Sequence, residues 1–516
     1  MEPYAIDVEK PFSAARQKLE EMATHLQSAA ALGMRHEDLE EYVLREGREL
    51  ERRMLQEHLD LRAAAERQVK VVGDDGIERS QVRASRRGLM SLVGEVTVSR
   101  LLYQAAGVFG RAPQDASLNL PAESFSLGVR RRVAEEVAAN SFDHGTERIT
   151  ATTGARIGKR QVEEEARRAA VDFESFYAAR QPTDIESEAT QLLVLSFDGA
   201  GIVMLPDDLR EATRRAAEAQ ASEPRRPPKR LKRGQKRNRK RMAEVAAVYA
   251  IEPHVRVPED IVRDLRPVQD VESSKRRPKP SGKRVWASVE RDAERVIEEA
   301  FEQASRRDPE RKRRWVVLVD GQEGQLSLVE AVAARMGVQI TIVLDIIHVL
   351  EYLWRASYCF HPDGSHEAEQ WVQKRLLMLL SGTSPSDVAA GMARSATLQG
   401  LENRDAVEEC ADYLCKYRDL LGYARALAEG LPIATGVIEG ACRYLVRDRM
   451  DKTGARWSLA GAEAVLKLRA LRANGDFDDY WRFHMNAEHD RNHAARYLHS
   501  EVPNPLPSRP RLRRVK

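Results

Sequence analysis

Short apolar runs in the second half of the chain are the clearest structural signal in the sequence. Residues 192–197 and 315–319 are largely apolar stretches of strand length, each followed at once by an aspartate, and a third such run covers 338–344. Residues 202–205 and 245–251 are further strand candidates, the first as a return strand paired with the run before it. Short apolar runs bounded by polar residues are typical of strands buried on both faces.

Amphipathic helical patterns separate these runs. We expect helices at 285–306 and 326–336, and a long helical insertion over 348–429. Strands that alternate with helices favour an α/β sheet, with the acidic residues gathered at the strand ends. The sequence therefore predicts an α/β domain formed by 191–347 and 430–500, with the all-helical insertion between its two parts.

The first third of the chain has different patterns. Residues 1–68 read as charged helices, and 69–127 as a small β-rich region with strand alternation over 95–103. Residues 128–190 are helical throughout, with a break at 152–154. Three short helices in a row fit either a helix-turn-helix DNA-binding unit or a plain helical connector.

One further helix is expected in the first half of the stretch 434–471, and it carries an acidic residue among basic ones. Its apolar positions follow helical spacing, whereas Glu439, Arg443 and Arg447 lie four residues apart on another face. Taken alone, this spacing indicates a pair of ion pairs on a solvated helix surface. Arg449, Lys452, Arg456 and Trp457 follow in the sequence.

Charge is unevenly distributed along the chain. The net charge of the 516 residues is only +3, although charged residues make up 32% of them. Basic residues are concentrated in two loops, 225–241 and 275–284, and in a proline-rich tail, 501–516. No acidic residue interrupts the first loop, which contains Lys232, Arg233, Lys236 and Arg237. Such a loop is either simply solvated or holds a polyanion such as DNA.

Cysteine usage and the N-terminus indicate the compartment. The four cysteines show no CxxC spacing, as expected for reduced thiols. The N-terminus lacks a signal-peptide pattern, and no stretch is long and apolar enough to cross a bilayer. We expect a cytoplasmic protein without a membrane partner.

Asp198, Asp320 and Glu439 are the residues whose combination indicates chemistry. Three carboxylates brought together repel one another unless cations lie between them. Hard ions such as Mg²⁺ or Mn²⁺ prefer oxygen ligands, and two of them about 4 Å apart support in-line phosphoryl transfer. Basic side chains beside Glu439 and in the two loops would hold the DNA backbone, and Trp457 either stacks on a base or packs in the core.

The order strand-Asp, strand-Asp, helical insertion, helix-Glu is that of RNase H-like nucleotidyl transferases. Several motifs in that order resemble the ISKra-type insertion-sequence transposases, which belong to the Mutator-like DDE superfamily. These motifs are SFDG at 196–199, LKRGQKR at 231–237, RDP at 307–309, VVLVDGQ at 316–322, LDIIHVLEYLW at 344–354, PIATGVIEGAC at 432–442 and DRMDKTGARW at 448–457. The resemblance covers roughly residues 192–497.

The resemblance implies a DNA transposase in which Asp198, Asp320 and Glu439 bind two Mg²⁺ or Mn²⁺ ions. Asp345 and His348 match an Asp-x-x-His pattern of the group and are expected to support the site. Relatives often carry a cysteine pair in the N-terminal β-rich region, but residues 102–110 contain no cysteine, so no zinc is expected.

The expected partners are double-stranded DNA, as terminal inverted repeats and as target, and further copies of the chain, in association with the nucleoid. Two alternatives remain open at this stage. One is an RNase H-like metal nuclease without strand transfer, and the other is a non-catalytic DNA-binding regulator derived from a transposase.

Overall fold

The chain forms two compact units in a computed structural model, which describes residues 11–180, 190–221, 238–264, 277–452 and 454–506. Unit 1 comprises Met1–Ala179 and Gly475–Lys516, and unit 2 comprises Arg180–Asn474. The predicted α/β domain is therefore too long at its end, because residues after 474 belong to unit 1. Their helix α21 (Phe477–Asn492) buries Tyr480, whose hydroxyl donates to the Ala169 carbonyl at 2.6 Å.

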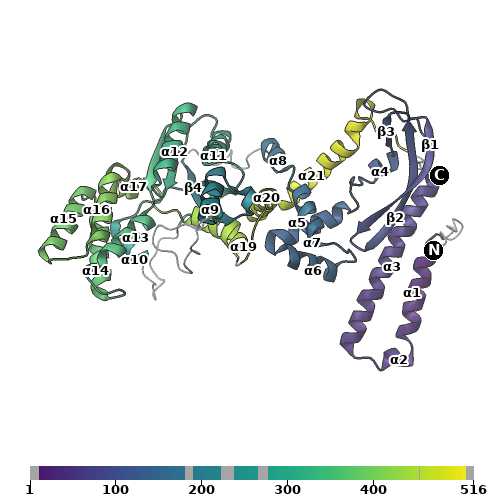
Figure 1. Cartoon of the computed structure of the whole chain (residues 1–516), viewed down its shortest axis with the longest axis horizontal. Helices are drawn as coiled ribbons and strands as arrows, with labels where there is room; N and C mark the ends of the chain where they lie inside the picture. Colours follow the sequence, from purple (N-terminus) through teal and green to yellow (C-terminus); the bar gives the residue numbers. More distant parts are fainter. Residues whose placement is uncertain (1–10, 181–189, 222–237, 265–276, 453, 507–516) are drawn as a thin grey trace, which may run out of the picture. The chain divides into compact units, whose positions relative to one another are not determined.

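Unit 1 begins with a helical hairpin that packs on a small antiparallel sheet. Helix α1 (Ser13–Leu26) lies against α3 (His36–Ala65), with α2 (Ala29–Leu32) at the bend (Figure 1). The sheet has the order β1 (Gln81–Ser91), β2 (Gly94–Ala105) and β3 (Val108–Arg111). Leu59 of α3 joins Leu89, Val96 and Val98 in the core, so the apolar face of the charged helix is covered by the sheet. Strand β1 was not predicted.

The helical region predicted at 128–190 is confirmed over its described part. Its helices are α5 (Leu127–Ala139), α6 (Phe142–Thr152), α7 (Lys159–Ala169) and α8 (Phe173–Ala179), preceded by the short α4 (Pro113–Ser117). Ser126 and Ser141 cap α5 and α6 through their side-chain oxygens. The last helical elements in the described part of the unit are the 3₁₀ turns Ala494–Arg496 and Leu498–Ser500.

Unit 2 contains a five-stranded mixed sheet, which confirms the predicted α/β class. The strands are β4 (Leu192–Val203), β5 (Lys240–Ile251), β6 (Ser281–Ser288), β7 (Trp315–Val319) and β8 (Ile340–Leu344), in the spatial order β6-β5-β4-β7-β8. β4, β5 and β6 pair antiparallel, whereas β4, β7 and β8 pair parallel. The strands are apolar because helices cover the sheet.

Helices of unit 2 fall into two groups. Those that pack on the sheet or connect its strands include α9 (Glu211–Ala221), α11 (Ala293–Arg307), α12 (Glu323–Met336) and α20 (Leu459–Asn474). The predicted helical insertion is present and forms a group of its own with α10 (Figure 1). Its members are α10 (Pro258–Asp264), α13 (Ile346–Ser357), α14 (His366–Leu380), α15 (Pro385–Leu398), α16 (Asp405–Lys416), the turn Arg418–Leu420 and α17 (Tyr423–Ala428).

Three predictions of local structure in unit 2 are wrong. Residues 202–205 do not return as a separate strand, because β4 runs on through Asp198 and pairs with β5 up to Val203. The helix expected from residue 285 begins at Ala293, and β6 takes 285–288 because Val285, Trp286 and Ala287 are buried there. Lys240, Arg241, Lys283 and Arg284 consequently lie on strands rather than in loops.

The segment that carries Glu439 is not one continuous α-helix. It consists of α18 (Gly436–Ala441), a π-helical turn over Cys442–Arg447 and α19 (Asp448–Met450). A π-helical turn changes the angular spacing of side chains, so residues four apart no longer lie above one another. None of the described helices is both long and apolar enough to cross a membrane.

Candidate active site

Asp198 lies on β4, and Asp320 directly follows the neighbouring parallel strand β7. The β4–β7 register pairs Leu195 with Val317 and Ser196 with Leu318. Two residues further along come Asp198, which is still on β4, and Asp320, the residue directly after β7. Both are partly buried. Asp198 Oδ1 accepts from the Gly199 amide at 2.6 Å, and Asp320 Oδ1 from the Gln322 amide at 3.0 Å.

The helical insertion holds the turn that follows β7. From α16, the Tyr413 hydroxyl donates to the Asp320 carbonyl at 3.4 Å, and the Tyr417 hydroxyl donates to the Gly321 carbonyl. Gly321 is buried with a φ of 92°, where a Cβ atom would meet Leu344 Cδ1 at 3.1 Å. Glycine is therefore required for the chain to turn at this point, and the two tyrosines fix the direction in which Asp320 leaves the strand.

Glu439 reaches the same region from α18. Helix α18 and the π-helical turn both pack against β4. The Cys442 thiol, one residue after α18, interacts with the Asp198 carboxylate. Burial raises the pKa of this thiol, and the Asp198 and Glu439 carboxylates raise it further, so Cys442 stays protonated. This contact joins the helix that carries Glu439 to the strand that carries Asp198.

Glu439 does not form the surface ion pair that its sequence spacing indicates. Arg443, four residues later, has its Nε atom 3.8 Å from Asp448 Oδ1 instead. Glu439 is exposed, and within the described residues its carboxylate makes no hydrogen bond or ion pair. The π-helical turn, which begins between the two residues, explains the difference. Both carboxylate oxygens of Glu439 are thus available to a ligand.

Asp345 is linked to the candidate site by hydrogen bonds at the start of α18. It is buried at the end of β8, caps α13 through the Ile347 amide at 3.0 Å, and accepts hydrogen bonds from the amide (3.4 Å) and hydroxyl of Thr435. The Thr435 carbonyl in turn accepts from the amides of Ile438 and Glu439. Asp345 thereby fixes the start of α18. His348 shows no such role: its Nδ1 atom lies 3.6 Å from Glu351 Oε2 on the outside of α13.

The predicted DNA contacts divide into three sets. Arg443, Arg447, Lys452 and Arg456 are exposed, which is compatible with phosphate contact. Lys232, Arg233, Lys236 and Arg237 lie outside the described residues. Arg449 and Trp457 are only 3% and 4% exposed, which argues against the prediction that they touch DNA.

Trp457 instead packs in the core beside β4. Its backbone amide donates to the Val203 carbonyl at 3.1 Å, and its indole N–H donates to the Met450 carbonyl at 3.2 Å. The Arg449 guanidinium lies over the indole ring, 4.6 Å from its centroid. Of the two roles open for Trp457 at the sequence level, core packing is the one that its burial supports.

A different group of side chains has the spacing of a compact metal site. Oxygen and nitrogen atoms of Asp172, His484 and Glu488 in unit 1 lie within 4.8 Å of one another, and this group could hold a metal ion. Among the described residues, no other group of three or more histidine, cysteine or acidic side chains has ligand atoms within 4.8 Å of one another. The ligand atoms of Asp198, Asp320 and Glu439 therefore lie further apart than this. Sequence reasoning missed the group because Asp172 lies about 300 positions from its partners.

Arginines already neutralise this group. Arg491 donates to both carboxylate oxygens of Asp172 at 3.0 Å and also to Glu488. Arg130 donates to Glu488 at 2.7 Å and to Glu165 at 2.8 Å. The hydrogen bonds of His484 and Arg491 lower the pKa of Asp172 to about 2, although burial opposes them. With two guanidiniums in place, the group acts as a buried ion-pair network that ties α21 to α5 and α7.

Comparison with known proteins assigns the chain to no family. No protein-family model matches the chain, and no curated protein sequence matches it. Its function is therefore argued from the site.

Proposed function

We propose that this chain is a DNA transposase that cleaves phosphodiester bonds at the ends of its element and joins the freed 3′ ends to target DNA. The observation that carries the proposal is the placement of three acids from separate elements around β4. Asp198 on β4 and Asp320, the residue after β7, each lie two residues beyond the paired Ser196 and Leu318. Glu439, which makes no ion pair within the described residues, lies on α18, directly before Cys442, which interacts with Asp198.

The sheet topology supports an RNase H-like assignment. That fold has three antiparallel strands followed along the chain by two parallel ones, and the sheet order β6-β5-β4-β7-β8 agrees with it. In the fold, acids lie on the first strand of the chain and after the fourth, which here are β4 and β7. The third acid then comes from a helix after the insertion, as in the transposases that the motifs resemble.

The donor set fits Mg²⁺ or Mn²⁺ ions. All three residues offer carboxylate oxygens, which these hard ions prefer, and the exposed Glu439 leaves the site open to solvent and to a large substrate. When bound, such ions polarise a phosphate and lower the pKa of water or a 3′-hydroxyl. Other residues position these ligands and the substrate. Asp345 and Thr435 orient α18, whereas Tyr413 and Tyr417 orient Asp320. Arg443 and Arg447 are exposed and would contact the DNA phosphates.

A joining assay tests the proposal. Duplex DNA with the inverted repeats that flank the gene is incubated with target DNA, Mg²⁺ and wild-type protein, Asp320→Asn or Glu439→Gln. Both variants should lose cleavage and joining by at least a thousandfold while binding the DNA ends as wild type does. Glu330→Gln, which changes an exposed carboxylate on α12, is the matched control and should behave as wild type.

Other results would assign another activity. Metal-dependent cleavage without joined product would indicate a nuclease of the same fold. Specific binding of the ends with no cleavage by the wild-type protein would indicate a regulator. Wild-type joining by both acid variants would refute the assignment of the site.

A further inference from the structure

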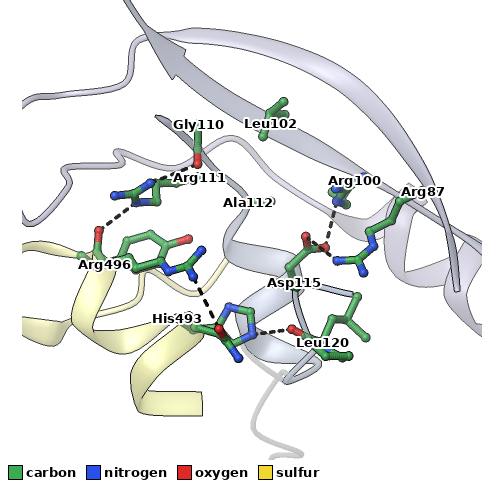
Figure 2. A pocket seen from close by; sticks show the side chains of 14 residues that line it. Arg87, Arg100, Leu102, Gly110, Arg111, Ala112, Asp115, Leu120, His493 and Arg496 are labelled. Carbon is green, nitrogen blue, oxygen red and sulfur yellow. Dashed lines mark hydrogen bonds and ion pairs between the residues drawn. The ribbon is translucent and has the colours of Figure 1, made fainter. Parts of the chain in front are cut away.

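Unit 1 contains a pocket of about 260 Å³ whose walls are rich in arginine. It is lined by Arg87 and Arg100 from β1 and β2, by Arg111 at the end of β3, and by Arg496 after α21. Figure 2 shows Arg111 and Arg496 on one side, with Arg87, Arg100 and Asp115 on the other. Leu102, Leu120 and Pro121 add an apolar wall.

The lining has more positive than negative charge. Asp115 is the single carboxylate among the lining residues, and it is shared by two arginines: its oxygens lie 2.8 Å from Arg100 Nε and 3.8 Å from Arg87 Nη1. Arg111 is paired at 3.0 Å with Asp74, which lies outside the lining. Among the described residues, two carboxylates form ion pairs with these four guanidiniums, and the charge of Glu123 also acts on Arg87. His493 adds no charge at neutral pH, because burial lowers its pKa to about 4.

These guanidiniums are held in place by the chain itself. Arg111 Nε donates to the Arg496 carbonyl at 2.9 Å, and Arg111 Nη1 donates to the Phe109 carbonyl at 3.2 Å. Arg87 donates to the Glu123 carbonyl, and Arg496 donates to Asn492 Oδ1 at 3.4 Å. Side chains of Arg87, Arg100 and Arg111 are only 19%, 11% and 12% exposed. These three fixed, poorly hydrated cations can bind an anion with little further loss of entropy. The Arg496 side chain is exposed.

We propose that this arginine pocket binds the phosphate group of a nucleotide, either free or at the end of a DNA strand. Guanidinium groups match the oxygens of a phosphate through paired hydrogen bonds. The pocket is larger than a phosphate ion requires, and its apolar wall suits an attached sugar or base. No residue of the pocket belongs to the three-acid site, so the inference stands independently of the proposed catalysis.

Calorimetric titration of the full-length protein tests the inference. The probes are thymidine 5′-monophosphate, thymidine, and a thymidine trinucleotide with and without a 5′-phosphate. The monophosphate should bind and thymidine should not. Arg496→Gln and Arg87→Gln should each weaken that binding at least tenfold, because each removes a charge-assisted contact. Arg83→Gln is the matched control: it is exposed on β1 outside the pocket and should change nothing.

The trinucleotides identify the source of the phosphate. If the 5′-phosphorylated form displaces the monophosphate and the other form does not, the ligand is a strand end. If neither displaces it, the ligand is a free nucleotide. Two results would overturn the inference: absence of binding by the monophosphate and by the phosphorylated trinucleotide, or equal affinity in wild type, Arg496→Gln and Arg87→Gln. Because the readout is binding, it is unaffected by whether the chain joins DNA.

Discussion

The Asp345 carboxylate accepts hydrogen bonds from both the hydroxyl and the backbone amide of Thr435, ninety residues further along the chain. Asp345 ends β8, and Thr435 begins the helix that carries Glu439. The sheet edge and the third acid are thus connected by one buried polar contact, which has consequences for activity.

Thr435→Val should lower the rate of strand joining by about a hundredfold, the order of loss expected when a catalytic group is displaced by about 1 Å. DNA affinity, measured by electrophoretic mobility shift, should change less than twofold, since Thr435 is buried. Thr435→Ser keeps the hydroxyl and should restore joining. Equal losses of joining in the valine and serine variants would show that the hydroxyl does not position α18.

Arg130 is the centre of the ion-pair network in unit 1. Its side chain is 1% exposed and contacts Glu123, Glu165 and Glu488. Arg130→Met should lower the free energy of unfolding by about 3–5 kcal/mol, because it leaves buried carboxylates without a cation. Arg160, 89% exposed and paired with Glu164, is the control; Arg160→Met should cost less than about 1 kcal/mol. Similar urea midpoints for the two variants would contradict the assignment.

His493 should make unit 1 less stable in mild acid. Burial, with nearby His489 and Arg496, lowers its pKa from 6.5 to about 4 in the folded chain. The unfolded chain therefore binds a proton between pH 6.5 and 4 that the folded chain does not, so stability falls as pH falls through that range. His493→Asn removes this titration, and its melting temperature should decline less than that of wild type between pH 7 and 4.5. Parallel curves would refute the effect.

The sequence was most informative where a strand is buried on both faces. Runs at 192–197 and 315–319 predicted β7 and part of β4, because central strands of such a sheet are apolar throughout. The run at 338–344 also predicted β8, although β8 is an edge strand and only partly buried. The run at 285–288 was ambiguous: it is short and leads into a helical pattern, so periodicity could not separate strand from helix.

Features of the site that depend on tertiary contact were not predictable. The π-helical turn after Ala441 has no sequence signature, although it decides that Arg443 pairs with Asp448 rather than Glu439. Arg449 and Trp457 are buried against each other, which argues against the prediction that these two residues of the basic cluster contact DNA. The arginine pocket joins residues about 400 positions apart, and no local pattern records that proximity.

The most direct test of the proposed metal ligands exchanges one of them for a softer donor. Glu439→Cys and Asp320→Cys are assayed for strand joining in Mg²⁺ and in Mn²⁺. A thiolate is a poor ligand for Mg²⁺ and a better one for Mn²⁺. We predict no joining by either variant in Mg²⁺, partial recovery in Mn²⁺, and wild-type joining by the control Glu330→Cys in both metals. Wild-type joining by Glu439→Cys and Asp320→Cys in Mg²⁺ would contradict the claim that these acids hold the catalytic ions.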